Sequence, residues 1–450
     1  MVTFFILSRG SSLNKYALIS LKSLYYLFPR VVREQYVDSV RFYCGLISRF
    51  AGSGFKVKKV ELVSELESLC SNCDKIFEIE GRNTSILAPN VFIDGLKCTR
   101  QPISSNLYDL KFYRLRDVFV LGETDAVIYK NRMYHQELYS MGNNHDLKQP
   151  DIFNKNKNKN KKDDWDYKIK YKNNILTIND TCISLLKEHS SNYYHCLTEI
   201  ATRLVALLEN VNVEVKIVNI LVDENVPTQA IDCFTHILNR YKKFEYQILT
   251  VEKGQLIRCR DLVFCTPTWL SLDNTKYLPN VKSEFLISSK DIELTRSALA
   301  GLLPAHSETP KRRIYLQRDN RGLRTITNIA QVERLLYKYN FEFVNPAHLS
   351  FLEQVELFSK AEIVIGASGA AFTNLLFMAP SSKAILLYPS AQCTNYYIFQ
   401  PLADASGVEL IHVLTVPEDT SGSLHGDASV NIQELQLLLN QYVSQGNISA

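Results

Sequence analysis

From about residue 170 onward, short apolar runs alternate with longer stretches whose apolar residues recur at helical spacing. Such runs predict strands and such stretches predict helices, the pattern of a parallel sheet with crossover helices. The predicted elements are helix 197–208, strand 215–222, helix 229–241, strands 246–251 and 261–264, helix 288–302, strand 313–317, helix 328–339, strand 341–344, helix 350–359, strand 363–365, helix 372–378 and strand 383–388. A segment containing Pro304 and Pro310 separates two blocks. We therefore predict an α/β protein with two Rossmann-like domains that face a ligand-binding cleft.

The earlier part of the chain predicts a different organisation. Residues 1–153 form a predicted N-terminal α+β region, with strands at 118–121 and 126–129. Residues 154–164, rich in Asn and Lys, predict a flexible linker or loop. The two Rossmann-like domains then occupy 165–303 and 304–450, the second ending in a C-terminal helix.

Composition excludes several classes of protein. Hydrophobic residues make up 46% of the 450 residues and charged residues 22%, which is ordinary for a globular protein. A net charge of +4 is too small to indicate a nucleic-acid partner. No apolar run is long enough to span a membrane, and ten scattered cysteines fit a reducing compartment. We expect a cytoplasmic protein.

Two local patterns carry alternatives. The first sixty residues hold ten Lys or Arg against two acidic residues, interleaved with Leu, Tyr and Phe. This segment is either a core-facing helix with a basic solvent side or a peripheral contact with the inner face of a membrane. Asp164 and Asp166 have the spacing of a metal and sugar-nucleotide motif, but they border the Asn/Lys tract rather than a buried strand. We therefore expect no metal site there.

The clearest candidate for chemistry is the turn after strand 363–365. Small residues fill this turn before the helix begins: Gly366, Ala367, Ser368, Gly369 and Ala370. A strand, a small-residue turn and a helix together direct backbone N–H groups and a positive dipole end toward an anion. Arg318, Arg321 and Arg324 follow the preceding predicted strand, and guanidinium groups bind phosphate oxygens in pairs. Standing alone, these arginines would indicate a solvated loop; beside this turn we favour a phosphate site.

This ordered set resembles glycosyltransferase family 61, which includes bacterial capsular polysaccharide transferases. The resemblance covers roughly residues 185–395 and is strongest from 313 to 388. The matching residues are Arg318, Arg324, Asn328, Phe351, Glu353, Gln354, Gly366, Gly369, Ala370 and Asn374. Gln317 stands where the family usually has Ser, and Ser368 stands where His is common, so position 368 offers only a neutral hydrogen bond.

A second match lies in the first block, where Asn192 and Tyr193 precede His195 and an acidic residue follows at Glu199. At this spacing His195 and Glu199 share one helix face, and a carboxylate raises the basicity of an imidazole. The alternative is a buried structural histidine. Given the family resemblance, we favour a general base, either His195 oriented by Glu199 or Glu199 itself.

The resemblance implies an inverting transferase with a GT-B fold, without a metal or another cofactor. Its co-substrate would be a nucleotide-sugar, with a UDP-sugar favoured, and its acceptor a glycan or lipid-linked hydroxyl in capsule or O-antigen biosynthesis. The residues expected at the donor diphosphate are Arg318, Arg324, Asn328, Glu353, Gly366, Ser368, Gly369, Ala370, Thr373 and Asn374, with Glu353 at the ribose. Two alternatives stay open: a non-catalytic nucleotide- or glycan-binding protein of the same fold, and a Rossmann oxidoreductase, against which the absence of a full G-x-G-x-x-G speaks.

Overall fold

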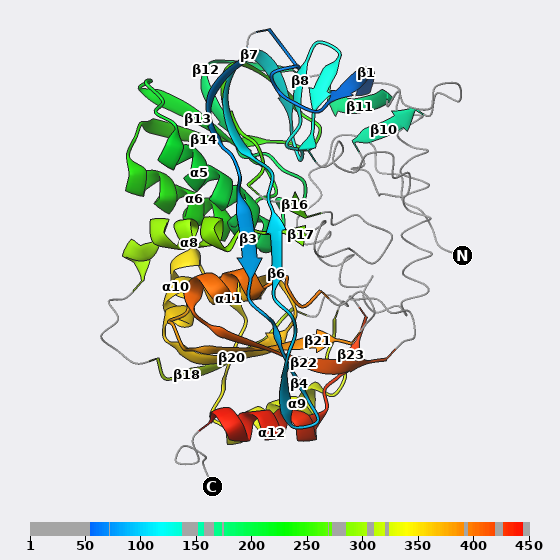
Figure 1. The fold of residues 1–450 in the computed structure, drawn as a ribbon, viewed down its shortest axis with the longest axis vertical. Helices are drawn as coiled ribbons and strands as arrows, with labels where there is room; N and C mark the ends of the chain where they lie inside the picture. Colours follow the sequence, from blue (N-terminus) through cyan, green and yellow to red (C-terminus); the bar gives the residue numbers. More distant parts are fainter. Residues whose placement is uncertain are drawn as a thin grey trace, which may run out of the picture. The chain divides into compact units, whose positions relative to one another are not determined.

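The computed structural model describes much of the chain from residue 55 to residue 443 (Figure 1). The described residues are 55–71, 73–136, 152–156, 166–172, 175–268, 270–271, 285–303, 310–319, 324–390, 395–418 and 426–443. They all belong to one compact unit. Residues 1–54, which hold most of the basic N-terminal segment, lie outside them, as do Asp164 and Arg321. The first residues of the Asn/Lys tract are in a strand, β10 (Phe153–Asn156), rather than in a loop.

The first sheet combines a parallel part with an antiparallel part. Its order is β10-β11-β1-β9-β8-β7-β15-β12-β13-β14, with β2 beside β7. The bounds are β1 Phe55–Val63, β2 Cys73–Ile79, β7 Leu110–Leu121, β8 Val127–Tyr129, β9 Arg132–Tyr134, β11 Asp166–Lys172, β12 Leu176–Ser184, β13 Ile217–Asp223, β14 Glu245–Val251 and β15 Leu256–Cys265. Strands β12 to β15 pair in parallel, and β12 contains an irregularity between Ile178 and Thr181 that bends it.

Helices connect these parallel strands. The segment from β12 to β13 holds α4 (Tyr193–His195), a π-helical turn η1 (Cys196–Ile200) and α5 (Ala201–Asn210). Helix α6 (Thr228–Tyr241) connects β13 to β14. Helix α8 (Ser289–Ala298) and the 3-10 turn η2 (Ala300–Leu302) follow the first sheet.

The second sheet has the order β19-β18-β20-β21-β22-β4-β5, with β23 beside β22. The strand bounds are β4 Asn90–Ile93, β5 Leu96–Thr99, β18 Arg312–Leu316, β19 Glu342–Val344, β20 Ala361–Ala367, β21 Lys383–Pro389, β22 Glu409–Pro417 and β23 Ala428–Ser429. From β19 to β22 every pair is parallel. When these five strands are numbered by their order along the chain, the sheet reads 2-1-3-4-5 from β19 to β22. The direction in which successive strands are added therefore reverses between β18 and β20. In open α/β sheets, ligands bind outside the carboxyl ends of the strands at such a reversal.

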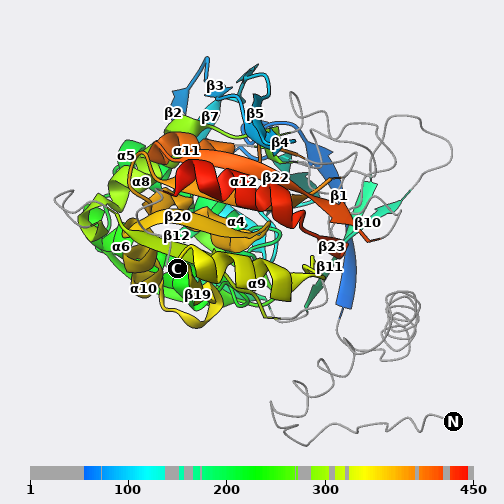
Figure 2. The same cartoon turned by 90° about the horizontal axis from the view of Figure 1, so that it is seen from below.

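Helices cover both faces of the second sheet. Helices α9 (Ile329–Lys338) and α12 (Ile432–Tyr442) pack on one face (Figure 2). The other face carries α10 (Phe351–Ser359), the 3-10 helix η4 (Ala370–Phe377) and α11 (Gln400–Ser406). Strand β20 explains why both faces are covered, because Ile363 and Ile365 join one core while Val364 joins the other. The strand predicted at 363–365 is confirmed, and its β-branched run is typical of a strand buried on both faces.

The core containing Val364 continues into the first half of the chain. It includes Phe234 of α6 and Leu204 of α5 together with Phe351 of α10 and Leu402 of α11. The two sheets are therefore joined by one continuous apolar layer of helices, drawn between them in Figure 1. Among the described helices, none is long and apolar enough to cross a membrane.

The early strands distribute between the two sheets. Strands β1, β2 and β7 to β9 belong to the first sheet, whereas β4 pairs with β22 and β5 pairs with β4 in the second. Strands β3 (Asn83–Ile86) and β6 (Ile103–Asn106) pair with each other between these groups, and β16 (Leu270–Ser271) pairs with β17 (Phe285–Leu286). A boundary at residue 153 consequently does not separate one sheet from the other. Local patterns indicate a strand but not its partner, and β4 lies more than 300 residues from β22.

Most predicted helices and strands from 197 to 388 are confirmed within a few residues. Two differ in kind. The predicted helix 372–378 is the 3-10 helix η4, and the helix predicted at 197–208 begins earlier and contains the π-helical turn. Strands β12 and β22 were not predicted. The structure confirms the predicted fold class as far as a mixed α/β architecture with parallel sheets.

Candidate active site

The turn after β20 is shaped by close packing rather than by unusual backbone angles. Gly366 and Gly369 both lie outside the left-handed region, since Gly369 has an extended φ of 177°. A Cβ on Gly366 would lie 2.9 Å from Cβ of Leu316 in the neighbouring strand β18. A Cβ on Gly369 would lie 3.3 Å from Cζ of Arg318. Glycine therefore lets β18 and the guanidinium of Arg318 approach the turn.

We expect Gly366→Ala to lower the free energy of unfolding by about 1–3 kcal/mol, because the added methyl group overpacks against Leu316. Urea unfolding monitored by circular dichroism measures this change. Gly301→Ala is the matched control, because a Cβ at Gly301 meets nothing within 4 Å. Equal free energies of unfolding for the two variants would show that Leu316 moves away from the added methyl group without loss of stability.

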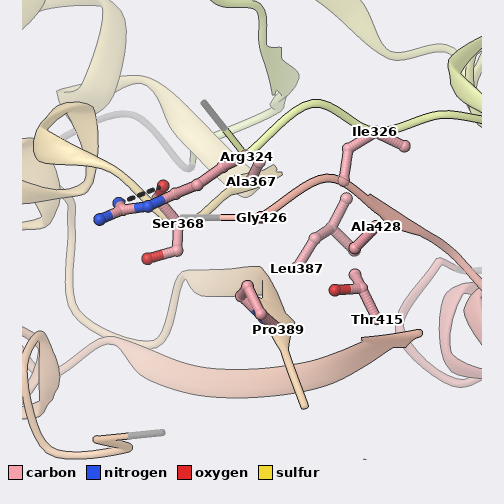
Figure 3. A pocket seen from close by; sticks show the side chains of 9 residues that line it. All are labelled: Arg324, Ile326, Ala367, Ser368, Leu387, Pro389, Thr415, Gly426 and Ala428. Atoms are coloured by element: carbon pink, nitrogen blue, oxygen red, sulfur yellow. Dashed lines mark hydrogen bonds between the residues drawn. The ribbon is translucent and has the colours of Figure 1, made fainter. Parts of the chain in front are cut away.

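Arg318 and Arg324 converge on one backbone carbonyl of this turn. Nη1 of Arg318 donates to the oxygen of Ser368 at 3.0 Å. Nη1 of Arg324 donates to the same oxygen at 2.9 Å (Figure 3). Burial and then the positive charge of Arg318 lower the pKa of Arg324 below its ordinary value. Two cations thus lie close together at the carboxyl ends of β18 and β20, where the winding reverses. An anion bound here would relieve their repulsion.

The position of Arg324 is set by the strand beyond it. Arg324 has a φ of +56°, a left-handed conformation that is strained for a residue with a side chain. Thr325 N donates to Oδ1 of Asp427 at 3.1 Å, and Ile326 forms a parallel bridge with Ala428. These bonds hold the strained residue with its guanidinium toward the turn.

A small open pocket lies beside this turn, with a volume of about 10 Å³, which is room for about one water molecule (Figure 3). Its lining residues are Arg324, Ile326, Ala367, Ser368, Leu387, Pro389, Thr415, Gly426 and Ala428. They include the carboxyl ends of β20 and β21, and Arg324 and Ser368 bring a charge and a hydroxyl to an otherwise mostly apolar wall. A space of this size is much smaller than the ligand pockets of about 300–1,000 Å³ found in proteins, so the case for an anion site rests on the two arginines rather than on this pocket.

Asn374 forms a buried hydrogen-bond network rather than an open contact. Its Nδ2 donates to Oε1 of Gln354 at 2.7 Å, and its Oδ1 accepts from the hydroxyl of Tyr193 at 3.0 Å. Gln354 in turn donates to the carbonyls of Pro346 and Leu349. This network fixes η4, and with it the turn at Ser368, against α10 and α4.

Two other residues of the predicted donor set also have structural partners. Asn328 binds both backbone groups of Val430, donating at 2.8 Å and accepting at 2.9 Å. Glu353 accepts from the N–H and the hydroxyl of Ser350, which caps α10. Thr373 is fully buried in η4, and its hydroxyl has no hydrogen-bond partner among the described residues. Ala370 begins η4, where the first N–H groups of a helix have no partner within that helix.

His195 and Glu199 are joined as the sequence spacing predicts. Nδ1 of His195 is hydrogen-bonded to Oε1 of Glu199, and both residues are less than one-tenth exposed. The π-helical turn begins directly after His195, and π-turns of this kind are frequent at functional sites. A histidine that donates Nδ1–H to a carboxylate carries its lone pair on Nε2, the form in which it accepts a proton.

Lys187 is the residue of this cluster that sequence reasoning missed. Its Nζ lies 3.2 Å from Oε2 of Glu199. Burial alone would raise the pKa of Glu199, but the charge of Lys187 and then that of His195 outweigh burial and lower the pKa to about 2. Glu199 is therefore a carboxylate across the physiological range and holds the imidazole. Lys187 lies outside the helix that pairs His195 with Glu199, so helical spacing gave no signal for it.

The two clusters come from different sheets and meet through aromatic contacts. The Tyr193 hydroxyl reaches Asn374 of η4, while the Tyr194 ring lies 5.5 Å from that of Phe399. Phe399 also lies 5.7 Å from Phe372 of η4. The short helix bearing His195 thus packs against the helix that follows the Ser368 turn.

Comparison with known proteins gives one finding on the family. The family model described as Glycosyltransferase 61 matches residues 193–385. This segment begins at Tyr193 and ends in β21, so it contains His195, Glu199, both arginines and the Ser368 turn, but not Lys187. No curated protein matches the chain.

Proposed function

We propose that this chain, whose residues 193–385 match the family model of glycosyltransferase family 61, moves a sugar from a nucleotide-sugar to an acceptor hydroxyl with inversion. A UDP-sugar is the donor we favour. The observation that carries this proposal is the convergence of Arg318 and Arg324 on the Ser368 turn at 3.0 and 2.9 Å. It supplies two positive charges at the edge of the sheet where α/β proteins bind nucleotides.

In the proposed step the acceptor oxygen attacks the anomeric carbon while Nε2 of His195 takes its proton. The bond from that carbon to the diphosphate oxygen breaks, and the nucleoside diphosphate leaves with the bonding electrons. Attack opposite the leaving group inverts the configuration. Glu199 keeps the imidazole in the tautomer that accepts this proton and stabilises the imidazolium that forms.

The charge that develops on the diphosphate is stabilised by Arg318 and Arg324, with the hydroxyl of Ser368 and the first N–H groups of η4 as neutral donors. We assign Asn328, Glu353 and Asn374 to positioning, because each already binds protein groups. Two guanidinium groups supply the charge that a divalent ion supplies in other transferases, so we propose transfer that needs no metal at the diphosphate.

A binding screen of the full chain tests the donor class. We expect UDP and one UDP-sugar to raise the melting temperature by mass action, with the same shift in EDTA. A shift with NADH and none with a nucleoside diphosphate would favour the oxidoreductase alternative. Binding of UDP-sugar without release of UDP in the presence of acceptors would favour a non-catalytic binding protein.

The acceptor is tested in the same assay. We propose a glycan or lipid-linked acceptor of surface polysaccharide biosynthesis, such as capsule or O-antigen, at the inner face of the membrane. UDP release should then increase when polysaccharide fragments or lipid-linked sugars in anionic liposomes are added. An increase with free monosaccharides alone would contradict this acceptor class.

A further inference from the structure

A second cluster of chemically active side chains lies beside the first. It consists of Asp125 in the turn between β7 and β8, His135 just after β9, and Glu188 after β12. Their exposed fractions are 2%, 0% and 6%. The proposed transfer step uses none of them, so their burial needs another explanation.

The geometry of the three side chains suits a metal ion. Nε2 of His135 lies 2.8 Å from Oε1 of Glu188 and 3.5 Å from Oδ1 of Asp125, and one ligand atom from each residue lies within 4.8 Å of the others. Nitrogen and oxygen ligands at tetrahedral Zn²⁺ lie about 2.0–2.2 Å from the ion, and therefore about 3.3–3.6 Å from one another. Small side-chain rotations would bring all three atoms to one ion.

Three oxygens of the cluster lack donors. Both carboxylate oxygens of Asp125 and Oε2 of Glu188 are buried without a hydrogen-bond partner among the described residues. A buried carboxylate without such partners is strongly unfavourable, and a bound cation is one recognised way to stabilise it. Asp125 is therefore an independent indication of a cation site.

Charge leads to the same conclusion. Lys187 lies 4.0 Å from Oδ2 of Asp125 and is shared with Glu199 at 3.2 Å. With His135 and His195 neutral, Asp125, Glu188 and Glu199 contribute three negative charges and Lys187 contributes one positive charge, which leaves a net charge of −2. Either one divalent cation or protonation of both histidines would balance it, and the metal titration below distinguishes the two.

The backbone holds the ligand-bearing loops together without the ion. Oδ1 of Asp223, at the end of β13, accepts from N of Glu123 at 2.6 Å, and its Oδ2 accepts from N of Lys187 at 3.0 Å. Glu123 and Lys187 are close neighbours in sequence of Asp125 and Glu188. Asp223 therefore holds the backbone segments that carry Asp125 and Glu188 close together.

We propose that Asp125, His135 and Glu188 bind one Zn²⁺. An imidazole with two carboxylates in a site closed to solvent suits a four-coordinate ion, whereas Mg²⁺ and Ca²⁺ take six or more oxygens. The ion joins the two ends of the β8–β9 hairpin, which carry Asp125 and His135, to the segment after β12 that carries Glu188. Lys187 contacts both Asp125 and Glu199. This proposal does not depend on the proposed transferase activity, and it places no metal at the diphosphate.

Zinc content of the untagged full chain tests the proposal. After removal of metal by EDTA and dialysis, titration with Zn²⁺ should give one bound ion per chain and a higher melting temperature. Titration with Co²⁺ should give the intense visible absorption of a tetrahedral ion. Asp125→Asn and His135→Gln should each weaken Zn²⁺ binding at least tenfold, whereas Asp232→Asn, an exposed control in α6, should bind as the parent chain does.

Asp125→Asn keeps the shape of the side chain and removes one repelling charge, so the metal-free variant should fold. Its circular dichroism spectrum and melting temperature in EDTA check this directly. His135→Gln gives a second measurement if that variant is unstable. Equal Zn²⁺ uptake by the parent chain and a folded Asp125→Asn variant, or no uptake by the parent chain, would overturn the proposal and leave protonated His135 as the balancing charge.

Discussion

Replacing His195 with alanine is expected to lower the rate of sugar transfer by about 10²- to 10⁴-fold, the range for loss of a general base. Nucleotide binding should be unchanged, because the diphosphate site is built from Arg318, Arg324 and the Ser368 turn. UDP release in steady-state kinetics measures the first quantity, and calorimetric titration with UDP measures the second. His348→Ala is the matched control, since His348 is exposed and binds Asp319 away from Glu199.

A pH profile separates a catalytic from a structural role. Glu199 stays ionised because its pKa is about 2, so loss of activity toward acid pH reports protonation of the imidazole. Glu199→Gln removes the anion that favours imidazolium, and we therefore expect the acid limb of kcat/KM to move to lower pH with a reduced maximum. An unmoved limb, or a His195→Ala variant with nearly full activity, would contradict the assignment of His195 as the base.

The features that could be predicted from the sequence are those that depend on residues close together along the chain. The pairing of His195 with Glu199 follows from helical spacing, and the burial of β20 on both faces follows from its β-branched run. The role of Lys187 could not be found, because its contact with Glu199 depends on how the segment after β12 folds back beside the helix. The pairing of β4 with β22 could not be predicted either, because it too depends on how distant segments fold together.

The turn at Ser368 shows a finer limit. Its small residues predicted an anion-binding loop, and the structure places Arg318 and Arg324 there. The reason for each small residue was different, however. Gly366 makes room for Leu316, Gly369 makes room for Arg318, and neither needs a left-handed backbone. Composition indicated that something approaches this backbone closely, and the tertiary structure determined what approaches it.

Replacing Arg324 with alanine is expected to weaken UDP binding by about 10- to 150-fold, the equivalent of one hydrogen bond to a charged group at about 1.5–3 kcal/mol. Arg324→Lys should recover only part of this loss, because an ammonium group cannot bind two phosphate oxygens in one plane. Arg240→Ala in α6 is the control for loss of one exposed arginine. Isothermal titration calorimetry at a single ionic strength gives all three affinities.

The double variant of Arg318 and Arg324 shows whether the two guanidinium groups act on one anion. Both donate to the Ser368 carbonyl, and the charge of Arg318 lowers the pKa of Arg324. Each therefore binds a diphosphate against the repulsion of the other, and removing one relieves the second. The loss of UDP-binding free energy in the double variant should therefore differ from the sum of the losses in the two single variants by at least about 0.5 kcal/mol. Strictly additive losses would show that the two arginines bind separate groups of the ligand. Undiminished UDP binding in both single variants would show that the diphosphate does not bind at this turn.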